Sequence, residues 1–196
     1  NLLQAGPILT RFQLPATVFV ATEGIGRQRE IWWDEMERAI LESETLPGFC
    51  SLSVGDRSFV WRLGRGRHYG PEERRLDRLV KPWEAKTDTR LAFFFAAWKF
   101  VRPMAPGDQQ RALDRLARWA ELEPMPRPEY RTLTAAEVQS LDSGGLLEVG
   151  AHTVHHLDLA AHLSAVQLEE IQGSKQVLEA LLERRVRVNS WRARIR

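Results

Sequence analysis

The chain has 196 residues, 43% of them hydrophobic and 28% charged, and its 28 basic and 26 acidic side chains give a formal net charge of +2. These values are ordinary for a globular protein, and so small a charge excess argues against a nucleic-acid partner. The single cysteine, Cys50, excludes a disulfide within the chain, and no apolar run approaches the roughly 20 residues of a transmembrane helix, so no transmembrane segment is expected.

The first part of the sequence predicts a helix, a strand and a second helix, in that order. Apolar residues near helical spacing indicate a helix over about 2–12, although Gly6-Pro7 weakens the pattern. The β-branched run ATVFVAT, residues 16–22, predicts a buried strand. The segment IWWDEMERAILES, residues 31–43, is typical of an amphipathic helix, and we interpret Trp32 and Trp33 as core side chains rather than sugar-stacking ones. The carboxylates of this helix are interpreted as solubilising charge (Asp34, Glu35, Glu37 and Glu42).

The middle of the sequence predicts a hairpin, a helical region and a linker. SLSVGDRSFVW, residues 51–61, alternates apolar and polar residues on both sides of Gly55-Asp56, which is a hairpin signal. Helical patterns follow from Pro71 to Leu122. The three prolines of EPMPRPEY, residues 123–130, predict an extended linker.

The last part of the sequence predicts helix, strand and helix again. Thr134-Ala-Ala-Glu137 is a capping-box sequence, so a helix is expected from there to about Ser143. LLEVG, residues 146–150, predicts a short strand. Ser164-Ala-Val-Gln167 is a second capping-box sequence that opens the longest periodic segment, in which Gly173 is the weak position. Strands separated by helices favour an α/β protein with parallel strands.

Three of the five histidines fall within GAHTVHHL, residues 150–157, directly after the second predicted strand. His152 and His156 are four positions apart, so one helical turn or a compact loop would let both imidazoles share an ion. Imidazole is a common ligand for zinc and similar divalent metals, and α/β folds bind ligands at the carboxyl ends of their strands. An HxxxH spacing also occurs by chance. The residues alone therefore leave two interpretations open, a metal site and incidental histidines.

Longer sequence motifs resemble a known family, which the histidine spacing alone does not indicate. LPATVFVAT, GAHTVHHLDL and EEIQGSKQVLE resemble the polysaccharide deacetylase family (NodB homology, carbohydrate esterase family 4), whose second motif reads H-[ST]-x-x-H. The resemblance covers about the first 45 residues and roughly 131–186. It implies a partial distorted (β/α) barrel, with residues 1–186 as the deacetylase domain, a helical insertion at about 62–130, and a divergent basic tail at 187–196.

The resemblance also implies a site and a substrate. His152 and His156 would bind a divalent metal, often zinc in such enzymes, and Thr153 would support their loop by hydrogen bonding. The reaction would be the hydrolysis of N-acetyl groups, which are carbon–nitrogen bonds outside peptides, on a polysaccharide or oligosaccharide. His155 and His162 match no functional position of the family and are interpreted as loop or surface residues.

The sequence departs from the family at both ends. The family's Asp-Asp pair, which supplies the third metal ligand and the general base, would lie before Asn1, and the later motifs are not found in VRVNSWRARIR, residues 186–196. We therefore expect a piece of a deacetylase with impaired activity or none, and its catalytic and substrate-binding residues stay unassigned. The compartment, cytoplasm or cell envelope, is open. The alternative is a non-catalytic, basic, helical binding module in which the histidines are incidental.

Overall fold

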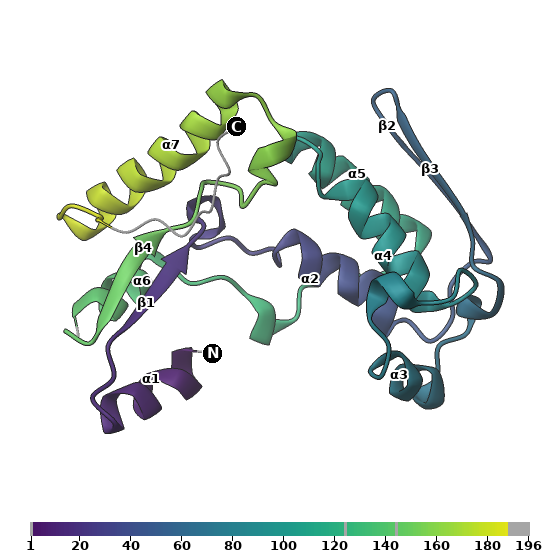
Figure 1. Ribbon diagram of the computed structural model, residues 1–196, viewed down its shortest axis with the longest axis horizontal. Helices are drawn as coiled ribbons and strands as arrows, with labels where there is room; N and C mark the ends of the chain where they lie inside the picture. The colour runs from purple at the N-terminus through teal and green to yellow at the C-terminus, as the bar shows by residue number, and fades with distance from the viewer. Residues whose placement is uncertain (1, 124, 144, 188–196) are drawn as a thin grey trace. The chain divides into compact units, whose positions relative to one another are not determined.

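The structure is a computed structural model that describes residues 2–123, 125–143 and 145–187, and it confirms the expected α/β class (Figure 1). The described chain forms two compact units. The terminal unit contains the residues up to Gln28 and those from Thr132 onward, and the central unit is Arg29–Arg131. The central unit includes the expected insertion of about 62–130 together with 29–61, so the bounds of that insertion stay a prediction. Residues 188–196 of the expected basic tail lie outside the described residues.

A parallel pair of strands forms the centre of the terminal unit. Strand β1 (Ala16–Val20) pairs with β4 (Leu147–Ala151), with Val18 opposite Val149. Parallel strands need a long crossover, and here the connection includes the entire central unit. Within the described residues the terminal unit has this one pair of strands, which confirms parallel pairing. The distorted barrel is not confirmed by it and stays a prediction.

A helix precedes each strand of this pair in the sequence. Helix α1 (Leu2–Arg11) precedes β1, and α6 (Ala135–Ser143) precedes β4. Helices α6 and α7 (Ser164–Leu182) pack on β4 and on each other, as Figure 1 shows. The buried residues of this core come from both strands, both helices and the segment after α7 (Val20, Val138, Leu141, Val149, Ala151, Leu178 and Val186).

The two predicted capping boxes have opposite outcomes. At the start of α6 the Glu137 carboxylate accepts from the Thr134 N–H at 2.8 Å, and the Thr134 hydroxyl accepts from the Glu137 N–H at 3.2 Å, so this box is confirmed. The box at Ser164 is wrong. The N-cap of α7 is Leu163, whose side chain cannot accept a hydrogen bond, and the Gln167 side chain donates instead to the His162 carbonyl at 2.8 Å. Ser164 is therefore already the first helical residue.

The central unit consists of helices around a hairpin. Strands β2 (Phe49–Val54) and β3 (Arg57–Arg62) form the predicted antiparallel hairpin, and Gly55 has the positive φ, 58°, that its tight turn requires. The helices are α2 (Trp32–Glu37), continued by a π-helical turn at Arg38–Glu42, then α3 (Pro71–Asp77), α4 (Arg90–Val101) and α5 (Pro106–Trp119). Short 3₁₀ turns lie at Gly64–Arg67, Pro82–Glu84 and Pro128–Tyr130, and in the terminal unit at Thr22–Gly24 and Leu159–Ala161.

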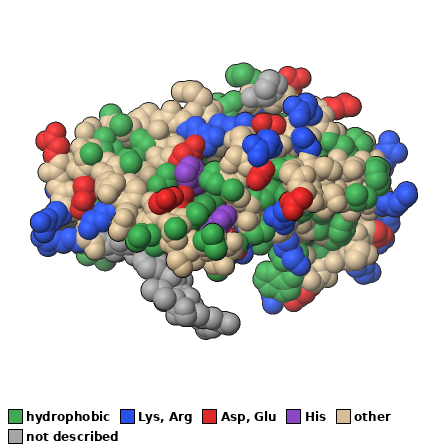
Figure 2. All heavy atoms as spheres, turned by 90° about the horizontal axis from the view of Figure 1, so that it is seen from above, with side chains coloured by type: hydrophobic (Ala, Val, Ile, Leu, Met, Phe, Trp, Pro, Cys, Tyr) green, Lys and Arg blue, Asp and Glu red, His purple; other side chains and the backbone are tan. Residues whose placement is uncertain are grey.

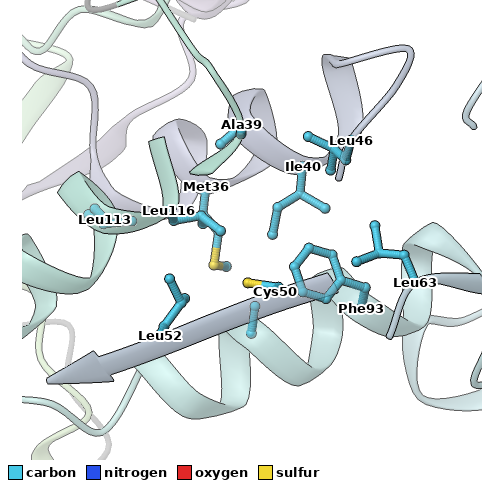
Figure 3. Close-up of a cluster of buried hydrophobic side chains, with 12 residues drawn as sticks. Met36, Ala39, Ile40, Leu46, Cys50, Leu52, Leu63, Phe93, Leu113 and Leu116 are labelled. Atoms are coloured by element: carbon cyan, nitrogen blue, oxygen red, sulfur yellow. The ribbon is translucent and has the colours of Figure 1, made fainter. Parts of the chain in front are cut away.

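The core of the central unit is a cluster of buried side chains from the hairpin and the helices (Figure 3). Phe93 of α4 is fully buried within it, next to Met36 and Cys50. Trp32 packs against the same cluster, which confirms its interpretation as a core side chain. Trp33 is half-buried and contacts the Trp32 ring edge-on, so its interpretation as a core side chain stays a prediction. Burial raises the pKa of the Cys50 thiol to about 12, so this cysteine is a protonated core residue at neutral pH.

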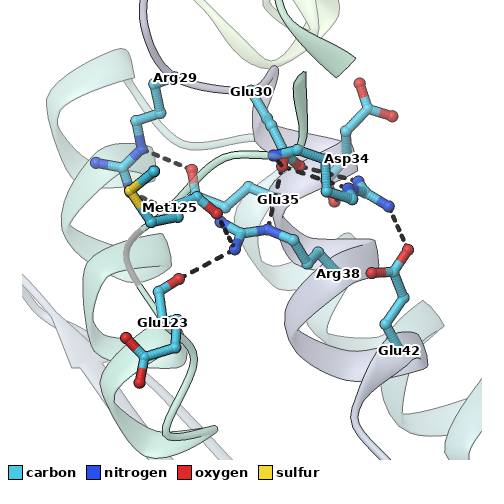
Figure 4. Close-up of polar contacts among 9 residues, drawn as sticks. Arg29, Glu30, Asp34, Glu35, Arg38, Glu42, Glu123 and Met125 are labelled. Atoms are coloured by element: carbon cyan, nitrogen blue, oxygen red, sulfur yellow. Dashed lines mark hydrogen bonds and ion pairs between the residues drawn. The ribbon is translucent and has the colours of Figure 1, made fainter. Parts of the chain in front are cut away.

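A buried ion-pair network fixes the proline-rich segment of the central unit (Figure 4). The Glu30 carboxylate accepts from the Arg127 main-chain N–H at 2.6 Å and faces Arg38 Nε at 3.1 Å. Arg38 donates in turn to the carbonyls of Glu123 and Met125. The segment 123–130, predicted as an extended linker, is therefore held by specific polar contacts. Glu35 is buried and pairs with Arg29, so its interpretation as solubilising charge was wrong.

Candidate metal centre

The predicted site lies in a loop at the carboxyl end of β4, residues 152–156, which we call the histidine loop. The His152 N–H donates to the Val20 carbonyl at 3.0 Å, which extends the pairing with β1 by one residue. The N–H groups of Thr22 and Glu23 donate to the Thr153 and Val154 carbonyls at 3.3 and 3.0 Å. Main-chain hydrogen bonds from β1 and the turn after it therefore fix one side of the loop.

Two residues of the histidine loop have left-handed backbone conformations. Thr153 has φ 62° and His156 has φ 57°, and such values are unfavourable for residues other than glycine, above all for a β-branched one. The buried Thr153 hydroxyl accepts from the His156 N–H at 3.0 Å, which offsets part of this cost. Strained conformations of this kind persist where surrounding contacts impose them, and they occur often at functional sites.

The loop brings the rings of His152 and His156 together. Their centroids are 4.3 Å apart and their planes are nearly perpendicular, at 83°. Both residues are half-buried, and histidine side chains are visible at the surface drawn in Figure 2. Burial, with the neighbouring His156, lowers the pKa of His152. The His152 ring is therefore neutral at pH 7, the state in which an imidazole nitrogen can bind a metal.

His155 does not join the other two histidines but contacts helix α7. Its Nδ1 lies 2.6 Å from Glu170 Oε1, and its main-chain N–H donates to Glu170 Oε2 at 2.9 Å. The hydrogen bond with Glu170 raises the pKa of His155 against the opposing effect of burial. Burial alone would raise the pKa of Glu170, but hydrogen bonds from His155 and from the Val154 main chain lower it below its usual value. The pair therefore favours imidazolium and carboxylate.

Sequence reasoning missed the His155–Glu170 pair. It identified His155 only as a loop or surface residue, and it noted Glu170 only as part of a helix pattern. Helical periodicity could have indicated that Glu170 is buried, because it lies one turn before the buried Ser174 on the same face of α7. A buried carboxylate needs a partner, and the nearby histidine cluster offers one.

Helix α7 also approaches the loop closely at Gly173. A Cβ at this position would lie 3.0 Å from Val154 Cγ2, which is tighter than ordinary van der Waals contact. The glycine that looked like a weak point in the helix therefore permits close packing against the histidine loop.

The paired imidazoles fit a divalent metal in chemistry and in spacing, but they are only two ligands. A catalytic zinc usually has three protein ligands and one open position. Throughout the described part of the chain, no group of three or more His, Cys, Asp or Glu side chains is arranged to hold a metal ion.

The paired histidines follow the carboxyl end of a parallel strand, the edge at which α/β sheets bind their ligands. A family model described as polysaccharide deacetylase matches residues 85–195, more than half of the chain. The chain therefore belongs to the polysaccharide deacetylase family, whose members are hydrolases of acetylated carbohydrates and are generally metal-dependent. The match includes the histidine loop and α7. It begins before the second stretch of the resemblance, at about 131, and does not include the first stretch of about 45 residues.

Comparisons with curated proteins and with solved structures give no match. None of the helices in the described ranges is both long and apolar enough to cross a membrane.

Proposed function

We propose that the chain acts as a metal-dependent hydrolase of N-acetyl groups on a polysaccharide or oligosaccharide, with His152 and His156 as ligands to a divalent metal, zinc in the first instance. The observation that carries the proposal is the close, perpendicular arrangement of these two rings at the end of β4, within the region that the family model matches. Family membership does not favour the alternative of a non-catalytic binding module with incidental histidines.

The chain's own residues would hold and orient the ligand pair. Pairing with β1 fixes the backbone of His152, and the Thr153 hydroxyl fixes the backbone of His156. The loop backbone is thus already ordered without a ligand, so little conformational entropy would be lost when a metal binds. A bound divalent metal would supply Lewis-acid chemistry, which polarises an acyl oxygen and makes a bound water more acidic.

We further propose that β1 and β4 are neighbouring strands of the family's distorted barrel. Residues 1–186 would form the deacetylase domain, and the range of about 62–130 would be an insertion within it. The parallel pairing of β1 with β4 supports this proposal, and so does the separate compact unit that lies between these strands in the sequence.

We infer that this polypeptide alone is a slow catalyst. Two neutral imidazoles leave a divalent cation without an anionic ligand, and the described residues offer no third ligand at this place. General-base catalysis is typically worth about 10²–10⁴-fold, and no described residue is assigned as the base, so we expect a loss of rate on that scale. Hydrolysis of an N-acetylated oligosaccharide with added zinc tests this inference. Turnover at the rate of an intact deacetylase would contradict it.

Zinc titration by calorimetry tests the ligand assignment. One zinc should bind per chain, and His152→Ala and His156→Ala should each weaken binding by at least about tenfold, since even losing a supporting residue costs that much. His68→Ala is the matched control because His68 is exposed and lies in the central unit. His155→Ala is a poor control, because it would also break the contact with Glu170. Equal weakening in all variants would show nonspecific binding and would overturn the assignment.

A further inference from the structure

We propose that Glu170 is a positioning residue that holds the histidine loop in the conformation bringing His152 and His156 together. This inference rests on the proposed metal-binding function. It assigns a role to a residue in the long helix α7, outside the loop that carries the ligands.

The contacts of Glu170 hold the loop in addition to those that β1 makes with it. Both carboxylate oxygens are used on one residue, since Oε2 accepts from the His155 main-chain N–H and Oε1 contacts the His155 ring. A carboxylate that binds both the main-chain N–H and the ring of one residue constrains the backbone at that residue, and does more than neutralise a charge.

His155 lies between the two left-handed residues of the loop. Thr153 and His156 have positive φ, so the chain turns sharply on both sides of the contact with Glu170. The hydrogen bond from the His156 N–H to the Thr153 hydroxyl closes the same turn. Without the Glu170 contact, the backbone at His155 would be free to relax the unfavourable angles, and the rings of His152 and His156 would separate.

The packing of α7 is consistent with this role. Glu170 is buried, and one turn later Gly173 lets the helix approach Val154. The carboxylate is thus carried by a rigid helix that contacts the loop at two successive residues, Val154 and His155. A supporting group on a regular element positions ligands more precisely than one on a loop.

The neighbouring Glu169 offers a matched control, because it is an exposed glutamate on the same turn of α7. Glu170→Gln keeps the side-chain size but removes the charge and one acceptor, whereas Glu169→Gln makes the same change on the surface. We expect Glu170→Gln to weaken zinc binding by about 10–100-fold, the usual effect of losing a group that orients a ligand, and Glu169→Gln to leave it unchanged.

A readout without metal separates positioning from general stability. Imidazole ¹H–¹⁵N spectra of the metal-free protein, at a pH where the rings are neutral, report the surroundings of His152 and His156 directly. Glu170→Gln should shift or broaden both sets of signals while amide signals of the β1–β4 core stay in place. Should Glu170→Gln fail to fold, His155→Phe removes only the ring contact with Glu170 and should give the same changes at smaller amplitude.

The outcomes distinguish this inference from the proposed function. If the wild-type chain binds no zinc, the proposed function fails, and the imidazole spectra still decide the role of Glu170. If the variant binds zinc as tightly as wild type, or if its His152 and His156 signals are unchanged, Glu170 is not a positioning residue. Weakened binding with altered ring signals, both absent in Glu169→Gln, supports the inference.

Discussion

The substitution Glu30→Gln tests whether the buried ion-pair network holds the central unit together. The Glu30 side chain is 0% exposed, and its partners Arg38 and Arg127 are 10% and 13% exposed. Glutamine has nearly the same size, so packing is preserved. The variant nevertheless leaves two largely buried guanidinium groups without their shared carboxylate. Removing one partner of a buried pair typically costs about 3–5 kcal/mol, and we expect a loss of unfolding free energy in that range.

The same network makes a prediction about acid. Burial raises the pKa of Glu30, but the hydrogen bonds from Arg127 and the charges of Arg38 and Arg127 outweigh it, so the pKa lies below its ordinary value. A carboxylate with a lowered folded-state pKa contributes stability above its unfolded pKa of about 4.3, and this contribution is lost as pH falls through the folded value. The stability difference between wild type and Glu30→Gln should therefore be constant near pH 7 and shrink below about pH 4.

Tryptophan fluorescence during urea unfolding measures this effect in the right place. Six of the seven tryptophans lie in the central unit (Trp32, Trp33, Trp61, Trp83, Trp98 and Trp119). With a denaturant slope of about 1–3 kcal/mol per molar urea, the expected loss lowers the midpoint by at least about 1 M. Glu72→Gln is the control, since Glu72 pairs with Arg75 on the surface and should change little. Equal midpoints for the two variants would refute the reasoning.

Three further substitutions test other contacts. Gly173→Ala should weaken zinc binding because its Cβ would push Val154, and the added change Val154→Ala should restore binding by removing the obstructing methyl groups; calorimetry that finds no rescue would contradict this explanation. Thr153→Val removes the acceptor of the His156 N–H and should destabilise the terminal unit by about 1–3 kcal/mol, measured by circular dichroism of its unfolding, and an unchanged transition would show that the hydroxyl is dispensable. Phe93→Ala should cost about 3–5 kcal/mol in the fluorescence assay because Phe93 is fully buried, whereas the same change at the more exposed Phe95 should cost clearly less, and equal losses would argue against the core as described.

Local sequence patterns predicted much of the secondary structure. The strands β1 and β4, the β2–β3 hairpin and the capping box of α6 depend on residues within a few positions of one another. The box at Ser164 failed although its sequence is equally good, because the end of the preceding loop already provides Leu163 in an extended conformation. Such a shift of one residue depends on the tertiary path of the chain, which local spacing does not contain.

The contacts that support the site could not be predicted in this way. His152 and His156 were identifiable because they are four residues apart after a strand. Glu170 lies 15 positions from His155, and Arg127 lies 97 positions from Glu30, so only the folded chain brings these partners together. Glu35 was misread for a different reason: its partner Arg29 is only six positions away, but it precedes the helix whose pattern suggested a solvated face.

X-ray absorption spectroscopy of the zinc-loaded chain tests the central claim most directly, because it counts the imidazoles bound to the metal. Wild type should show two imidazole nitrogens at about 2.0–2.1 Å from zinc. His156→Ala and His152→Ala should each show one, and His68→Ala should still show two. An imidazole count that stays the same when His152 or His156 is replaced would contradict the claim that these two rings share one ion.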